Sequence, residues 1–144
     1  GYDIEWGPYY ALVIGNDKYK NFNALTTPIV DVKAIGKTLQ DKYGFKVEVL
    51  TNGSREDILD KLYEYRSILT AKDNLLIYYA GHGDKDENSK EGYWQPIGSK
   101  PYRPSTWISN SEIITYVLVL NRIKALMKIR IIFQNNFSLF INTL

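Results

Sequence analysis

The sequence predicts an α/β fold in which helices cover both faces of a doubly wound, mostly parallel sheet. Strand patterns alternate with helix patterns along the chain, and two of the strand patterns are continuous apolar runs, which suit strands buried on both faces. The two clearest helix patterns also carry signals for their first residues. Right-handed crossovers then give the strand order 2-1-3-4, counted along the chain, with the two most apolar strands in the centre.

The first half of the chain contains two strand–helix units. Residues 9–15 form a continuous apolar run and are predicted to be a buried strand. Pro28 opens a helical pattern with apolar residues at steps of three and four, and Gly44 ends it. Residues 45–50 alternate apolar and charged side chains, which predicts a strand near an edge of the sheet. Ser54, followed three positions later by an aspartate, predicts the N-cap of a second helix.

The second half begins with another apolar strand pattern at residues 75–80, which runs directly into Gly81-His82-Gly83. Residues 84–107 are polar and rich in Gly and Pro, so we expect a long irregular stretch with at most a small hairpin at residues 93–97. Such long loops are usually functional or mobile.

A third helix and a fourth strand are expected after this stretch. Ser109 followed by Glu112 predicts a capping box and a helix that runs to about Met127. Residues 128–133 then predict the fourth strand. We expect one domain over residues 1–144.

Composition excludes several classes of protein. The chain is 44% hydrophobic and 24% charged, with a net charge of +2, which argues against disorder, nucleic-acid binding and attachment to a membrane surface. The chain has no cysteine and one histidine, which excludes disulfides, cysteine zinc sites and multi-histidine metal sites. Charges break every apolar run before the roughly 18 residues of a membrane span. We expect a cytoplasmic protein with no cofactor; the first residue is not Met, so a removed leader stays open.

Sites in such sheets form beyond the carboxyl ends of the strands, and here two places qualify: the turn at His82 and the segment 134–137. His82 is the single histidine and has glycine on both sides, which leaves space for a substrate to approach. The N–H group of Gly83 is a candidate donor to a developing oxyanion. The alternative is a structural histidine in a loop.

Three segments resemble the caspase-like cysteine peptidases, with the bacterial and metacaspase-type branch as the nearest likeness. They are Tyr-Ala-Leu-Val-Ile-Gly-Asn at 10–16, Leu-Leu-Ile-Tyr-Tyr-Ala-Gly-His-Gly at 75–83 and Gly-Tyr-Trp-Gln-Pro-Ile at 92–97. The resemblance implies a large-subunit (p20-type) domain that cleaves peptide bonds. It also implies that His82 pairs with a cysteine after the next strand and that Gly83 belongs to the oxyanion hole.

The sequence departs from that pattern at the nucleophile. Counting from the fourth strand places Asn136 at the cysteine position, 136 − 82 = 54 residues after His82, where the family spacing is about 50. An amide cannot act as the thiolate does, so we expect catalytic silence. Gln134 stands where metacaspase-like members place an aspartate that sets specificity, and Gln occurs there in animal caspases, where it helps to bind an acidic P1 side chain.

The family fold continues with two further strands, so we expect this domain to be incomplete at its C-terminal end, before the last two strands. The fourth strand would then have an exposed edge through which the chain could self-associate; the alternative is that residues 137–144 fold back over it. A pseudo-enzyme that binds a peptide or partner protein and a gene fragment without function both stay open.

Two acidic features complete the candidates. Asp17 follows the first strand, at the same end as His82, and could line a pocket for a basic side chain; N-capping or solvation is the alternative. Asp84, Asp86 and Glu87 lie beside His82, and calcium-dependent metacaspases suggest a calcium role for them. Their spacing is not that of a calcium-binding loop, so a solvated turn is the alternative.

Overall fold

The computed structural model describes residues 8–70, 72–118, 127–132 and 138–143. Three parallel strands form its central sheet in the order β2-β1-β3: β1 (Tyr9–Gly15), β2 (Lys46–Thr51) and β3 (Asn74–Ala80). Val13 on β1 lies opposite Val49 on β2 and Tyr78 on β3. These strands confirm the predicted α/β class, the central place of β1 and the edge position of β2.

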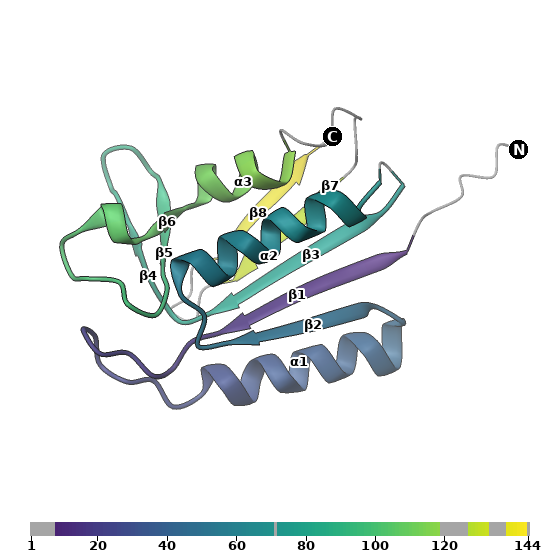
Figure 1. Ribbon diagram of the computed structural model, residues 1–144, viewed down its shortest axis with the longest axis horizontal. Coiled ribbons are helices and arrows are strands. Elements are labelled where there is room, and N and C mark those ends of the chain that lie inside the picture. The colour runs from purple at the N-terminus through teal and green to yellow at the C-terminus, as the bar shows by residue number, and fades with distance from the viewer. Residues whose placement is uncertain (1–7, 71, 119–126, 133–137, 144) are drawn as a thin grey trace, which may run out of the picture.

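Helices cover both faces of this sheet (Figure 1). α1 (Pro28–Tyr43) packs on one face, and α2 (Arg55–Ile68) and α3 (Asn110–Leu118) lie on the other. Side chains of β1 alternate between the two layers: Val13 joins the apolar cluster of α1, whereas Leu12 and Ile14 join that of α2. The buried residues of α2 are Ile58, Leu59, Leu62 and Tyr65.

The predicted starts of α1 and α2 and the predicted end of α1 are confirmed, whereas the prediction that the third helix runs to about Met127 is wrong, because Met127 begins the strand β7 (Met127–Ile132). Pro28 occupies the first turn of α1, and Gly44 ends the helix in the left-handed conformation with φ 68°. Ser54 and Asp57 form a reciprocal capping box at the start of α2. The Ser109 hydroxyl accepts a hydrogen bond of 3.0 Å from the Glu112 N–H at the start of α3.

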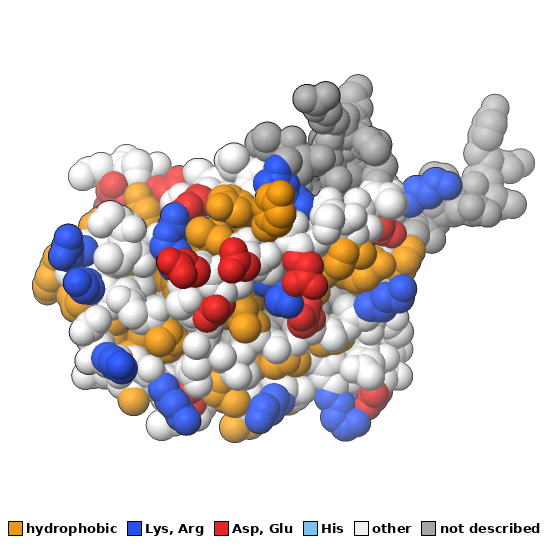
Figure 2. Space-filling model, in the orientation of Figure 1, with side chains coloured by type: hydrophobic (Ala, Val, Ile, Leu, Met, Phe, Trp, Pro, Cys, Tyr) orange, Lys and Arg blue, Asp and Glu red, His pale blue; other side chains and the backbone are white. Residues whose placement is uncertain are grey.

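Figure 2 shows the face that α2 and α3 cover, with carboxylates gathered over α2 and lysine and arginine side chains along the lower rim over α1. The exposed acidic residues of α2 are Glu56, Asp57, Asp60 and Glu64. α1 and α2 are therefore amphipathic, with apolar side chains against the sheet and charged side chains in water.

A second, antiparallel sheet follows β3 at the end of the molecule where β1 and β3 terminate (Figure 1). It consists of β4 (His82–Lys85), β5 (Gly92–Gln95) and β6 (Ile108–Ser109), with a 3-10 turn at Pro104–Thr106. As expected, most of residues 84–107 lie outside helices and strands and a small hairpin is present, but it is formed by β4 and β5 and ends at Gln95. The expectation that His82 lies in a turn is wrong, because His82 begins a strand paired with Gln95. Gly and charged residues have weak strand propensity, and here pairing with β5 and burial of Trp94 stabilise the strand.

The last two strands, β7 (Met127–Ile132) and β8 (Ser138–Thr143), pair antiparallel, and β7 lies beside β3. The strand predicted at residues 128–133 therefore exists, one residue earlier. The exposed edge that we expected for this strand does not exist, because β8 pairs with it. The alternative, that residues 137–144 fold back over the strand, describes this arrangement. Within the described ranges α3 ends at Leu118, and none of the helices there is long and apolar enough to cross a membrane.

Candidate active site

The site is built where the carboxyl ends of β1 and β3 meet. The N–H of Asn16, just after β1, donates a 2.9 Å hydrogen bond to the carbonyl of Ala80, the last residue of β3. The segment of residues 16–27 therefore starts beside the turn into His82. Its path is fixed by Asn52, whose side-chain oxygen accepts hydrogen bonds from the N–H groups of Asp17 and Lys18 at 3.0 and 3.1 Å.

This segment folds against the imidazole of His82. Nε2 of His82 lies 2.7 Å from the carbonyl oxygen of Asn23. The ring of Tyr19 meets the imidazole edge to face at 4.6 Å, and Phe22 stacks on it at 5.3 Å. The histidine is held by three contacts from one loop, although it is only half-buried.

The contact with Asn23 determines which ring nitrogen carries the proton. A backbone carbonyl can only accept a hydrogen bond, so Nε2 is the protonated nitrogen and the lone pair of the neutral ring is on Nδ1. Among the residues described, Nδ1 has no hydrogen-bond partner. The available proton acceptor is therefore Nδ1, on a ring whose other nitrogen is engaged.

Gly83 follows as the second residue of β4, exposed and opposite Trp94. Because Gly83 has no side chain, its backbone can be approached from solvent. Its role as an oxyanion donor stays a prediction. The space beside Gly81, which we expected to be open to a substrate, is filled by two tyrosine side chains. A Cβ there would lie 2.7 Å from the hydroxyl oxygens of both Tyr19 and Tyr79.

Asp17 lies at the same end of the sheet as His82, two residues before Tyr19. Its Oδ1 is buried and has no hydrogen-bond partner in the described part of the chain. Its negative charge also contributes to the raised pKa of the Tyr19 hydroxyl, for which burial is the main cause. Asp17 does not cap a helix, and its role in substrate binding stays a prediction.

Gln134 and Asn136 lie outside the described residues, so their placement relative to His82 also stays a prediction. The sequence reasoning missed Tyr19, Tyr79 and Asn23 as residues of the site. The sequence signal of the two tyrosines is weak, because an aromatic residue in a strand or loop is usually part of a core. Asn23 has no sequence signal, because it contributes only its backbone carbonyl.

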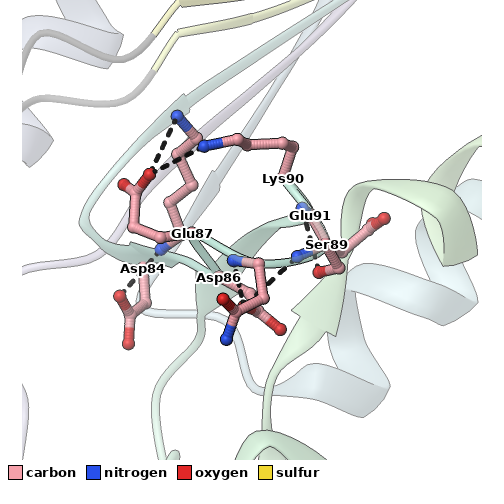
Figure 3. Close-up of polar contacts among 8 residues, drawn as sticks. Asp84, Asp86, Glu87, Ser89, Lys90 and Glu91 are labelled. Carbon is pink, nitrogen blue, oxygen red and sulfur yellow. Dashed lines mark hydrogen bonds and ion pairs between the residues drawn. The ribbon is translucent and has the colours of Figure 1, made fainter.

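The acidic residues after His82 hold their own turn together (Figure 3). Asp86 accepts hydrogen bonds from the N–H groups of Asn88 and Ser89, which lower the pKa of its carboxyl group. Glu87 pairs with Lys85 and Lys90. Within the described ranges no three His, Cys, Asp or Glu residues could hold a metal ion, so these carboxylates do not fit a calcium site.

Comparison with known proteins agrees with this architecture. The sequence profile of the caspase domain, Peptidase C14, matches residues 9–134. The chain belongs to the caspase domain family. This match includes β1 to β3, the glycine–histidine–glycine element and the small sheet that follows it.

Two curated relatives of this caspase domain are mammalian. The human mucosa-associated lymphoid tissue lymphoma translocation protein 1 and its homologue from Mus musculus are each 30% identical over 105 residues. The matched region is 72% of this chain but 12% of either relative. A solved structure, protein GSU0716 from Geobacter sulfurreducens, superimposes with a TM-score of 0.66 at 14% identity, covering 88% of this chain and 50% of that one. That similarity supports the fold alone.

Proposed function

We propose that this caspase domain retains the histidine half of a cysteine peptidase site but does not cleave peptide bonds by thiolate attack. The observation that carries the proposal is the combination of a positioned imidazole with a chain that contains no cysteine. The assignment of Asn136 to the nucleophile position supports it further.

The reaction of the family shows what each residue would contribute. A neutral imidazole takes the proton of the thiol, the thiolate attacks the peptide carbonyl, and the imidazolium then protonates the leaving amine. Nδ1 of His82 is the nitrogen suited to both transfers, because Nε2 is engaged by Asn23. The Gly83 N–H would stabilise the tetrahedral oxyanion. The carboxamide of Asn136 has no proton that an imidazole can remove near neutral pH, so the first step does not start.

A peptide-binding role is the second candidate, and one observation favours it. Oδ1 of Asp17 is buried without a hydrogen-bond partner in the described part of the chain. A buried carboxylate oxygen in this state is stabilised by a bound cation. Asp17 as a whole is only half-buried, so a lysine or arginine side chain of a bound peptide would supply that cation by pairing with the carboxylate from its exposed side. Gln134, in contrast, would favour an acidic side chain.

Two measurements test the proposal. Incubation with fluorogenic peptides bearing Arg, Lys or Asp at P1, with and without Ca²⁺, should give no turnover; turnover that His82→Ala abolishes would contradict catalytic silence. Binding of the same peptides by fluorescence anisotropy tests the second candidate. Affinity for the basic peptides that Asp17→Asn removes would support it, and no affinity for any of them would favour a fragment without function.

The placement of Asn136 has its own test. In Asn136→Cys the new thiol should alkylate roughly tenfold faster at pH 7 than the exposed thiol of the control Ser105→Cys, because a nearby imidazole lowers the pKa of a cysteine. Adding His82→Ala should remove the difference. Equal rates in all three proteins would show that position 136 does not face the histidine.

A further inference from the structure

Hydrogen bonds to two tyrosine hydroxyls hold the backbone of His82 on both sides. Its N–H donates to the hydroxyl oxygen of Tyr19 at 3.0 Å. Its carbonyl accepts from the hydroxyl of Tyr79 at 2.8 Å. The two hydroxyl oxygens are 3.3 Å apart. Because each hydroxyl donates once and accepts, the bonds close a cycle from the His82 N–H through Tyr19 and Tyr79 back to the His82 carbonyl.

The cycle joins three parts of the fold. Tyr79 lies on β3 and is fully buried, with its ring stacked on Trp94 of β5 at 4.7 Å. The same hydroxyl also lies 3.0 Å from the carbonyl oxygen of Gln95, so its single proton is shared between the carbonyl groups of His82 and Gln95. Tyr19 comes from the segment that follows β1. The start of β4 is thus tied at once to the core strand, to the neighbouring strand and to the loop over the imidazole.

The residue before His82 makes room for this arrangement. A Cβ at Gly81 would lie 2.7 Å from both hydroxyl oxygens, closer than a side chain tolerates. Burial raises the pKa of the Tyr19 hydroxyl and, more strongly, that of Tyr79. Both hydroxyls therefore stay protonated at neutral pH and remain able to donate.

We propose that Tyr19 and Tyr79 are positioning residues for His82. Their hydroxyls fix the peptide groups on either side of its Cα, so the side chain leaves the strand at one angle and Nε2 meets the carbonyl of Asn23. The result is a single tautomer with its lone pair on Nδ1. The use of that lone pair in catalysis rests on the proposed function, whereas the positioning itself does not.

The single histidine makes the test direct. In ¹⁵N-labelled chain, NMR reports the imidazole tautomer from the two ring nitrogens and the exchange rate of the His82 amide proton. Tyr19→Phe keeps the ring that contacts the imidazole and removes only the hydroxyl. Tyr79→Phe removes the other. Tyr78→Phe is the matched control, since it makes the same change on the same strand but packs in the cluster of α1.

We expect His82 amide exchange to be about tenfold faster in Tyr19→Phe, the effect of losing one hydrogen bond in a locally opening strand. Both Tyr19→Phe and Tyr79→Phe should convert the single Nε2–H tautomer into a mixture, whereas Tyr78→Phe should change neither signal. Unchanged imidazole signals in both variants would overturn the proposal, even if amide exchange changed, because the hydroxyls would then be structural only.

The unmodified chain keeps the proposal testable if a variant fails to fold. An unprotected His82 amide, or a mixture of tautomers in the native protein, would overturn it without any substitution. This outcome is independent of the thiol reactivity of Asn136→Cys and of peptide binding. Failure of the proposed function and failure of the positioning role are therefore distinguishable.

Discussion

The ion pair between Arg55 and Glu112 connects the first residue of α2 to the first turn of α3. Nη1 of Arg55 donates to Oε2 of Glu112 at 2.9 Å and to the carbonyl of Trp107 at 3.1 Å. Nη2 donates to the second carboxylate oxygen. The two-point contact joins α2 to the segment that enters α3, on which the small sheet carrying His82 also depends.

Its contribution to stability follows from its geometry and exposure. Hydrogen bonds to charged groups contribute about 1.5–3 kcal/mol when buried, whereas an exposed ion pair contributes about 0.2–1 kcal/mol. The side chains of Arg55 and Glu112 are 35% and 28% exposed, so this pair lies between the two limits. We expect a coupling free energy of about 1.5 kcal/mol.

A double-mutant cycle of Arg55→Ala and Glu112→Ala measures this coupling. Its advantage is that the loss of other contacts of each side chain cancels. Urea unfolding followed by tryptophan fluorescence is suitable, because Trp94 and Trp107 are buried and the carbonyl of Trp107 accepts a hydrogen bond from Arg55. The control cycle uses Lys37 and Asp41, a pair with side chains 79% and 50% exposed, whose coupling should be smaller because water screens it. A coupling for Arg55 and Glu112 no larger than the control would refute the reasoning.

Three further changes have defined outcomes. Gly81→Ala places a Cβ 2.7 Å from two hydroxyl oxygens and should lower the free energy of unfolding by about 1–3 kcal/mol in urea melts; no loss would show that the tyrosines move aside freely. Ser54→Ala removes a capping box and should cost about 1 kcal/mol, whereas an unchanged midpoint would mean that α2 does not need the cap. Burial raises the pKa of Tyr79 and Tyr65, so the folded state keeps protons that unfolded tyrosines lose near their ordinary pKa of about 10. The contribution of these tyrosines to the free energy of unfolding should therefore be constant below about pH 10, and the free energy of unfolding should fall as the pH rises beyond it, with a smaller slope in Tyr79→Phe; equal slopes would contradict the assignment.

Local signals account for what could be predicted. Pro28, Gly44 and the Ser54–Asp57 pair act within a few residues of themselves, so the sequence indicates where α1 and α2 begin and where α1 ends. The apolar runs of β1 and β3 likewise record burial on both faces. His82 could be selected because it is the single imidazole and directly follows such a strand.

By itself, then, the sequence determined the order of the three central strands and of the helices, the family and the histidine, because each depends on residue type and short-range spacing. Only the tertiary structure decided which nitrogen of His82 is free. That depends on the Asn23 carbonyl, 59 positions away, and on the hydroxyls of Tyr19 and Tyr79, themselves 60 positions apart. A carbonyl group is present at every residue, so no sequence pattern can mark the one that the folded chain brings to the imidazole.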